Sequence, residues 1–82
     1  MALTGHVLLY TWSSCSFCGE AKRLLEAHGV AYQERPLDGD TRRRDQLAKL
    51  FGTPTMPYVL LDGEPLGGLE ELRRRLAEET SP

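Results

Sequence analysis

The spacing of apolar positions changes several times along the chain, and each change predicts a new element. Val7 to Tyr10 are continuously apolar, which predicts a strand that is covered on both faces. From Ser16 onward, apolar residues recur at helical spacing until Gly29, which predicts a helix with a glycine cap. Its inward positions are Phe17, Ala21, Leu24, Leu25 and His28. Residues 30–35 alternate more weakly and predict a second strand, closed by Pro36, so that strand, helix and strand form a right-handed βαβ unit.

The next stretch predicts a second helix. Asp38-Gly39-Asp40 is a turn, and Asp40 or Thr41 is the candidate N-cap of a helix that ends at Gly52. Its expected inward residues are Leu47, Leu50 and Phe51. The arginines at positions 42–44 lie in its first turns, where a solvated face is the favoured interpretation, although guanidinium groups near a thiol site could also hold a substrate carboxylate.

The last third of the chain predicts a hairpin and a helix. The apolar run Tyr58 to Leu61 is typical of a buried strand entered through proline, and Asp62-Gly63 is a two-residue hairpin signal. Pro65 places the returning strand at the edge of the sheet. Gly67-Gly68 then breaks the chain before a helix with Leu69, Leu72 and Leu76 at positions i, i+3 and i+7.

The order βαβαββα predicts an α/β fold of thioredoxin-like type, with a four-stranded mixed sheet and three helices on both of its sides. Because the chain has 82 residues, we expect one domain spanning residues 1–82. A net charge of −2 gives no electrostatic reason for a nucleic acid or membrane partner. The first six residues lack the pattern of a secretion signal and no apolar run could span a bilayer, so we expect a cytoplasmic protein.

The two cysteines, Cys15 and Cys18, stand where the first strand gives way to the first helix. In a chain that alternates strands and helices, this C-x-x-C spacing predicts a thiol redox pair. Cys15 at the first turn would gain the helix dipole and free N–H groups, which favour a thiolate, and Cys18 would lie one turn on within bonding reach. Cys15 is therefore the expected nucleophile and Cys18 the resolving thiol. Half of a zinc site, or a pair of buried structural thiols, is the alternative, although a closed zinc site needs four ligands.

No side-chain general base is evident near this pair. His6 lies at the far end of the first strand, about 15 Å from the cysteines, and His28 lies about 20 Å along the helix. Activation of the nucleophile is therefore expected to come from the helix start and its N–H groups.

Four separated motifs in a fixed order make the sequence from Val7 to about Ala77 similar to the glutaredoxin family. They are Tyr10-Thr11 with Cys15-Ser16-Phe17-Cys18, Asp38-Gly39, Thr55-Met56-Pro57, and Gly67-Gly68 with Glu70-Glu71. The resemblance implies a glutathione-dependent thiol-disulfide oxidoreductase that reduces protein disulfides and glutathione mixed disulfides. It also implies roles in electron transport and cell redox homeostasis. We expect a monomer with no metal of its own.

The resemblance also assigns residues to glutathione. It implies that Pro57 is preceded by a cis peptide bond and faces the cysteines, and that the backbone of Met56 pairs with the tripeptide. Close approach at Gly68, with the N–H groups of Leu69 and Glu70 that follow, would hold the γ-glutamyl carboxylate. Glu71 replaces an aspartate that commonly meets the γ-glutamyl amine. Trp12 replaces the usual lysine, so a charge near the nucleophile is missing and an aromatic ring is available to stack on substrate.

Two alternatives to the glutathione-dependent enzyme stay open. Ser16 replaces the usual proline between the cysteines, and family members with serine there have been associated with a [2Fe–2S] cluster held in a dimer. Cys15 of each subunit and two glutathione thiols would then supply four thiolates. The other alternative is a dedicated electron donor to ribonucleotide reductase that is reduced by thioredoxin reductase, although such donors usually lack the Gly67-Gly68 pattern.

Overall fold

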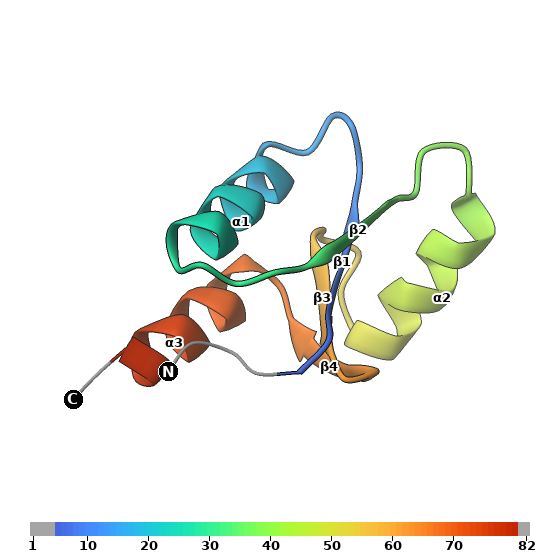
Figure 1. Cartoon of the computed structure of the whole chain (residues 1–82). Coiled ribbons are helices and arrows are strands. Elements are labelled where there is room, and N and C mark those ends of the chain that lie inside the picture. The colour runs from blue at the N-terminus through green and yellow to red at the C-terminus, as the bar shows by residue number, and fades with distance from the viewer. Residues whose placement is uncertain (1–4, 81–82) are drawn as a thin grey trace.

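The computed structural model describes residues 5–80, and within that range the chain forms one four-stranded sheet and three helices (Figure 1). The elements in chain order are β1 (Val7–Thr11), α1 (Ser16–Ala27), β2 (Gln33–Pro36), α2 (Thr41–Phe51), β3 (Tyr58–Leu61), β4 (Glu64–Gly67) and α3 (Leu69–Thr80). The sheet order is β2-β1-β3-β4. Strand β2 runs parallel to β1, whereas β3 is antiparallel to both β1 and β4. The predicted order βαβαββα and the mixed sheet are confirmed.

The sheet separates two apolar layers, with α1 and α3 on one face and α2 on the other (Figure 1). The alternation along β1 divides its side chains, because Val7 and Leu9 enter the first layer while Leu8 and Tyr10 enter the second. The first layer comprises Val7, Leu9, Ala21, Leu25, Val30, Val59, Leu72 and Leu76. The second comprises Tyr10, Cys18, Leu37, Leu47, Met56, Tyr58 and Leu60. Each fully buried leucine or valine contributes about 1.5–3 kcal/mol, so the first layer holds α1, whose start carries the cysteines, firmly against the sheet.

Strand β2 starts later than the sequence predicts. Gly29 has a φ of 68°, and the N–H groups of Gly29 and Val30 donate to Glu26 O at 3.1 Å and Leu25 O at 2.9 Å. This arrangement closes the carboxyl end of α1 and uses the backbone of Val30, which therefore cannot open a strand. The strand begins at Gln33 and includes Pro36, whereas Val30 was expected to begin it and Pro36 to follow it.

Two expected core residues are on the surface instead. Phe17 is 52% exposed and Leu50 is 58% exposed. On α2 the pair Leu47 and Phe51, one helical turn apart, makes the contact with the sheet, and Leu50 lies beside that face. Phe17 belongs to the first turn of α1 and lines a groove rather than the core. The helical spacing placed both residues on the correct helix but not at the correct depth.

The ends of the other elements agree with the sequence. Asp40 caps α2 by accepting the Arg43 N–H at 3.1 Å, and Gly52 ends it in the left-handed region. Asp62 and Gly63 both have positive φ, which is the conformation of a two-residue hairpin turn. Within residues 5–80, no helix has the length and apolar character needed to cross a membrane. Residues 1–4, on which most of the expectation about a secretion signal rests, lie outside the described residues.

Candidate active site

Cys15 is the N-cap of α1. Its sulfur accepts the backbone N–H of Cys18 at 3.1 Å, and its own N–H donates to Trp12 O at 3.1 Å. The first turn of α1 contains no acidic residue. The positive end of the helix dipole is therefore unopposed by a carboxylate and points at a half-exposed sulfur, an arrangement that stabilises negative charge on that atom.

Cys18 lies one turn further along α1 and is buried in the second apolar layer, with only 2% of its surface exposed. Burial raises the pKa of the Cys18 thiol from 9.0 to about 12, and the hydrogen bond with Cys15 adds to the rise. Both cysteines are free thiols. The two sulfurs thus occupy contrasting environments within one helical turn, and Cys18 stays protonated at neutral pH.

The segment before β3 faces Cys15 from across the site. The Met56-Pro57 peptide bond is cis, as the resemblance implied. The Cys15 thiol lies 3.8 Å from Met56 O, which accepts a weak S–H hydrogen bond. Among residues 5–80, nothing accepts the Met56 N–H. A donor on one side of Met56 is therefore available beside the reactive sulfur.

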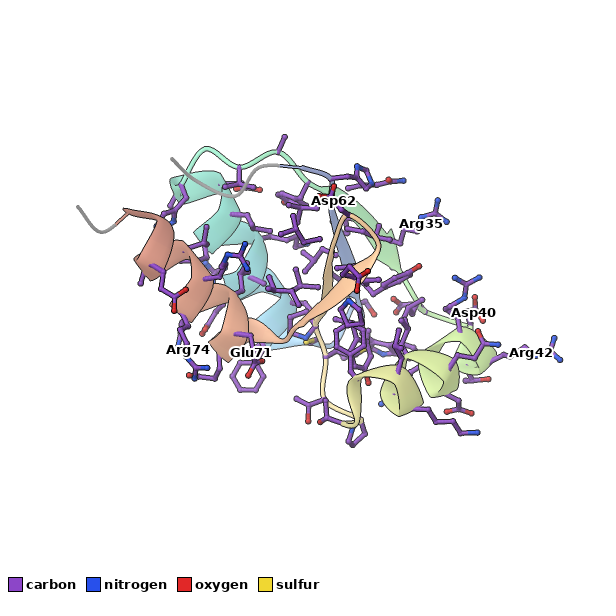
Figure 2. All side chains as sticks on the ribbon, turned by 90° about the horizontal axis from the view of Figure 1, so that it is seen from below. Arg35, Asp40, Arg42, Asp62, Glu71 and Arg74 are labelled. Carbon is purple, nitrogen blue, oxygen red and sulfur yellow. The ribbon has the colours of Figure 1, made fainter. Side chains whose placement is uncertain are left out.

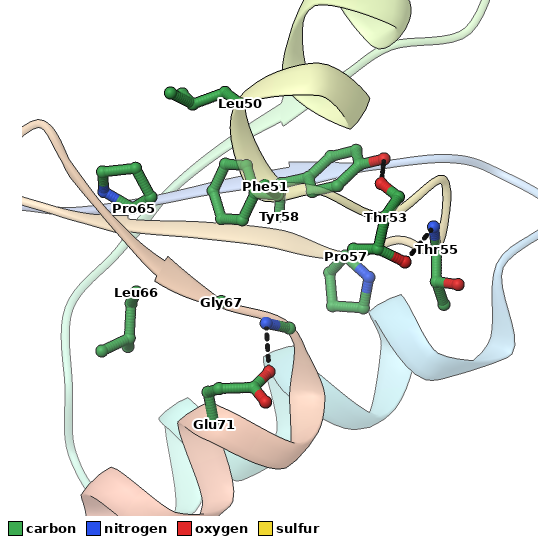
Figure 3. A pocket seen from close by; sticks show the side chains of 11 residues that line it. Leu50, Phe51, Thr53, Thr55, Pro57, Tyr58, Pro65, Leu66, Gly67 and Glu71 are labelled. Carbon is green, nitrogen blue, oxygen red and sulfur yellow. Dashed lines mark hydrogen bonds between the residues drawn. The ribbon is translucent and has the colours of Figure 1, made fainter.

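The start of α3 borders the same region. The Gly68 N–H donates to Glu71 Oε1 at 2.8 Å, and Figure 3 shows Glu71 turned back toward this stretch of backbone. A Cβ atom at Gly68 would lie 3.4 Å from Pro57 O, so the two segments pack backbone against backbone. Pro57 and Gly68, which the resemblance assigned to the same ligand, are thus brought into contact, and the Glu71 carboxylate already accepts a hydrogen bond at the helix start.

A groove of about 380 Å³ runs between these two segments. Its lining includes most of the residues that the resemblance assigned to glutathione, namely Met56, Gly68, Leu69, Glu70 and Glu71. Three further residues that it did not assign also line the groove, namely Phe17, Thr53 and Thr55. Pro57 lines an adjoining cavity of about 350 Å³ that reaches Leu50 and Phe51 (Figure 3). Phe17 and Leu50 are exposed because each lines one of these two hollows instead of packing into the core.

The family model described as Glutaredoxin matches residues 7–66. The chain belongs to the glutaredoxin family. It is 37% identical over 67 residues to glutaredoxin 3 of Escherichia coli K12, and the alignment covers 82% of this chain and 81% of that protein. The solution structure of a glutaredoxin from Brucella melitensis aligns with a TM-score of 0.80 at 26% identity, over 93% of this chain and 82% of the other. A buckwheat glutaredoxin-glutathione complex has the same fold, with a TM-score of 0.74 at 24% identity over 88% and 76%. As a glutaredoxin, the chain is a thiol-disulfide oxidoreductase.

Trp12 does not line the groove between Met56 and Leu69. It packs with Cys15 against the second apolar layer, and the Arg44 guanidinium lies 5.0 Å above its ring. Arg43 donates to the Tyr10 hydroxyl at 3.3 Å, whereas Arg42 points away from the fold at the start of α2 (Figure 2). All three arginines are exposed, as the favoured interpretation predicted, and the third member of the run also brings its positive charge to the ring of Trp12.

A third hollow of about 300 Å³ lies behind the cysteines. Thr11, Cys18, Lys22 and Glu34 line it, together with Cys15 and Asp38. The Lys22 ammonium lies 3.3 Å from Glu34 Oε2, which also accepts the Thr11 hydroxyl at 2.7 Å. Asp38 accepts from the backbone N–H of Ser13 at 3.1 Å, which anchors the cysteine loop. Sequence reasoning missed Lys22 and Glu34, and the available signal was that Lys22 stands four residues after Cys18.

Proposed function

We propose that this chain reduces glutathione mixed disulfides and protein disulfides, with glutathione as its co-substrate. The Cys15 thiolate attacks a disulfide sulfur, forms a mixed disulfide and expels a thiolate. Glutathione or Cys18 then attacks the Cys15 sulfur and releases the second thiol. The observation that carries the proposal is the position of Cys15, which lies between an unopposed helix start and the Met56 carbonyl.

The groove gives glutathione a consistent orientation. Its cysteinyl residue would pair with the free backbone N–H of Met56, as an added strand does, which brings its sulfur to Cys15. Its γ-glutamyl carboxylate would meet the N–H groups of Leu69 and Glu70, which the first turn of a helix leaves without internal partners. Glu71 already accepts the Gly68 N–H, so its second oxygen is the acceptor that we assign to the γ-glutamyl amine.

Arg44 supplies the charge that Trp12 lacks. Its guanidinium is stacked on the Trp12 ring, and within residues 5–80 it has no carboxylate partner. We assign it to the glycine carboxylate of glutathione, because a guanidinium binds a carboxylate through two parallel hydrogen bonds.

A coupled assay tests the proposal. We expect turnover of a small glutathione mixed disulfide with glutathione and glutathione reductase, and slow reduction of insulin with thioredoxin reductase. The reverse preference would contradict glutathione dependence and favour the dedicated donor. The variant R44Q should raise KM for the mixed disulfide about tenfold, since a charge-assisted pair is removed. The matched control R42Q removes the same charge from the outward-pointing position and should leave KM unchanged.

The cluster carrier remains a prediction. Among residues 5–80, no three His, Cys, Asp or Glu side chains form a metal site, so a cluster as cargo would need thiolates from a second subunit and from glutathione. Anaerobic reconstitution with iron, sulfide and glutathione should give a coloured dimer if the chain carries clusters. A colourless monomer would contradict the cluster carrier and leave the oxidoreductase as the one proposed function. We further propose that the protein is a monomeric single domain located in the cytoplasm.

A further inference from the structure

The hollow behind the cysteines is lined by Lys22, whose positive charge has no role in the reaction proposed above. When Cys18 resolves a mixed disulfide on Cys15, it must first lose its proton, because the thiolate is the attacking species. Cys18 is almost fully buried, and burial is the largest cause of its raised pKa. Resolution by Cys18 therefore needs a group nearby that stabilises the ionised sulfur.

Lys22 has the required position. It stands four residues after Cys18 on α1, so the two side chains share one face of the helix, and both line the hollow. The Lys22 charge also lowers the pKa of Cys18 against the effect of burial. Among the described residues, it is the ammonium group that lines this hollow.

The Lys22 side chain is held rather than loose. Its Nζ lies 3.3 Å from Glu34 Oε2, and that same oxygen accepts the hydroxyl of Thr11, which is 3% exposed. Thr11 and Glu34 come from the neighbouring strands β1 and β2, so the sheet fixes the carboxylate to which Lys22 is tied. This chain of contacts runs from the buried sheet to the mouth of the hollow.

The other charged groups of the hollow and of the elements around it have partners other than Cys18. The Asp38 carboxylate accepts from Ser13, and Glu20 pairs with Arg73 of α3 at 3.0 Å. Arg44 of α2 is stacked on Trp12. Cys15 shares the hollow, but its sulfur is already in a disulfide when Cys18 attacks. Lys22 is itself paired with Glu34, but it lines the hollow together with Cys18, and it is therefore the positive charge beside the resolving thiol.

We propose that Lys22 stabilises the thiolate of Cys18 during resolution, and that Glu34 and Thr11 are positioning residues that act through Lys22. The inference rests on the proposed function, whose dithiol branch it deepens. In this step the Cys18 thiol gives its proton to solvent at the hollow, and its thiolate attacks Cys15 Sγ. The Cys15–Cys18 bond forms, the bond from Cys15 to the substrate sulfur breaks, and the substrate leaves as a thiolate that takes up a proton.

The first test isolates Cys18 in a Cys15→Ser background, in which the rate of Cys18 alkylation is followed against pH. We expect K22Q to slow alkylation about threefold at pH 8 and to move the profile to higher pH, since a nearby positive charge is lost. K22R should restore most of the rate. The control R23Q removes the same charge from an exposed neighbour on α1 that does not line the hollow, and should change little. Equal effects of K22Q and R23Q would overturn the assignment of Lys22.

The second test addresses the positioning residues without changing any charge. T11V removes the hydroxyl that holds Glu34, so it should slow Cys18 alkylation less than K22Q does, and have no effect when K22Q is already present. An equal effect of T11V in both backgrounds would overturn the positioning role.

A separate readout keeps this inference distinct from the proposed function. K22Q should slow release of a thiol from a mixed disulfide preformed on Cys15 in the intact dithiol protein. Turnover of the glutathione mixed disulfide by a Cys18→Ser variant, where glutathione itself resolves, should be unaffected by K22Q. A loss in both reactions would overturn the specific role of Lys22, whereas absence of all glutathione turnover would instead contradict the proposed function.

Discussion

Helices α1 and α3 begin side by side at the site, and they satisfy their first N–H groups in opposite ways. Helix α3 has Glu70 and Glu71 in its first turn, and Glu71 accepts the Gly68 N–H at 2.8 Å. Helix α1 has no acidic residue there, and the sulfur of Cys15 accepts the Cys18 N–H at 3.1 Å. One helix start is closed by a carboxylate, and the other is left to a group that can ionise and react.

This difference separates stability from chemistry. A carboxylate at a helix start contributes roughly 0.3–1 kcal/mol through the dipole and satisfies a free N–H group. A carboxylate beside Cys15 would instead repel a developing thiolate. The first turn of α1 thus omits a stabilising residue that α3 has, and that omission keeps the dipole available for the sulfur.

The largest effect is expected from removing the sulfur that uses the open helix start. Cys15→Ser should reduce turnover of a glutathione mixed disulfide to background, because a hydroxyl is not ionised at neutral pH. Cys18→Ser should keep that activity and lose reduction of protein disulfides. The coupled glutathione reductase assay measures both variants. If Cys18→Ser were the inactive variant, the roles of the two thiols would be reversed.

The contrast within α1 itself can be measured by the pH dependence of alkylation. Burial raises the pKa of the Cys18 thiol to about 12, so Cys18 is protonated at pH 7. Iodoacetamide at pH 7 should therefore label Cys15 long before Cys18, as mass spectrometry of peptides would reveal. In a Cys15→Ser variant, the alkylation rate of Cys18 should still rise with pH above pH 9, because burial remains the main cause of the shift. A plateau below pH 9 would contradict the burial argument.

Much of this fold follows from local sequence rules, and the site residues that fail to follow from them have a common cause. The apolar run of β1, the glycine after α1 and the Asp62-Gly63 turn act through neighbours in sequence, so each element was predicted in its place. The pairing of Lys22 with Glu34 and the stacking of Arg44 on Trp12 join elements that are distant in sequence and meet only in the folded protein.

The same dependence on distant elements explains why Phe17 and Leu50 were wrongly predicted to be buried. Helical spacing gives the direction of a side chain around its own axis, but burial depends on what lies opposite. Opposite Phe17 and Leu50 there are grooves rather than strands. For Cys15 and Cys18, the motif spacing predicted the helix start correctly, whereas the burial of Cys18 required the second apolar layer.

The close packing at the start of α3 predicts a sensitive glycine. Gly67 has a φ of 134°, and a Cβ atom there would lie 2.5 Å from Glu71 Cγ. Gly67→Ala should lower the free energy of unfolding by about 1–3 kcal/mol, through strain and displacement of Glu71. Gly68→Ala is the matched comparison and should cost less, because its Cβ would meet Pro57 O at 3.4 Å and Glu71 Oε1 only at an ordinary 3.7 Å. Urea denaturation measures both, and equal losses would contradict the role of the Glu71 contact.

Opening the closed helix start should have a smaller effect. Glu71→Ala removes the carboxylate that accepts the Gly68 N–H and should lower the free energy of unfolding by about 1 kcal/mol. Glu70→Ala, which removes an acidic residue from the same turn but not this hydrogen bond, should cost only a few tenths of that amount. Thermal unfolding compares the two, and a larger loss for Glu70→Ala would show that the cap is not what stabilises α3.

The smallest effect, and the most direct test of the comparison, comes from closing the open helix start. Ser16→Asp places a carboxylate in the first turn of α1, where α3 already has two. Its interaction with the dipole should raise the thermal midpoint slightly, while repulsion should slow alkylation of Cys15 about two- to fivefold, since the change corresponds to about 0.3–1 kcal/mol. Ala27→Asp adds the same charge at the last residue of α1 and should leave the alkylation rate unchanged. Stability and reactivity must move in opposite directions if a carboxylate and a thiolate compete for the same helix start, so a variant that gains or loses both together would break the comparison.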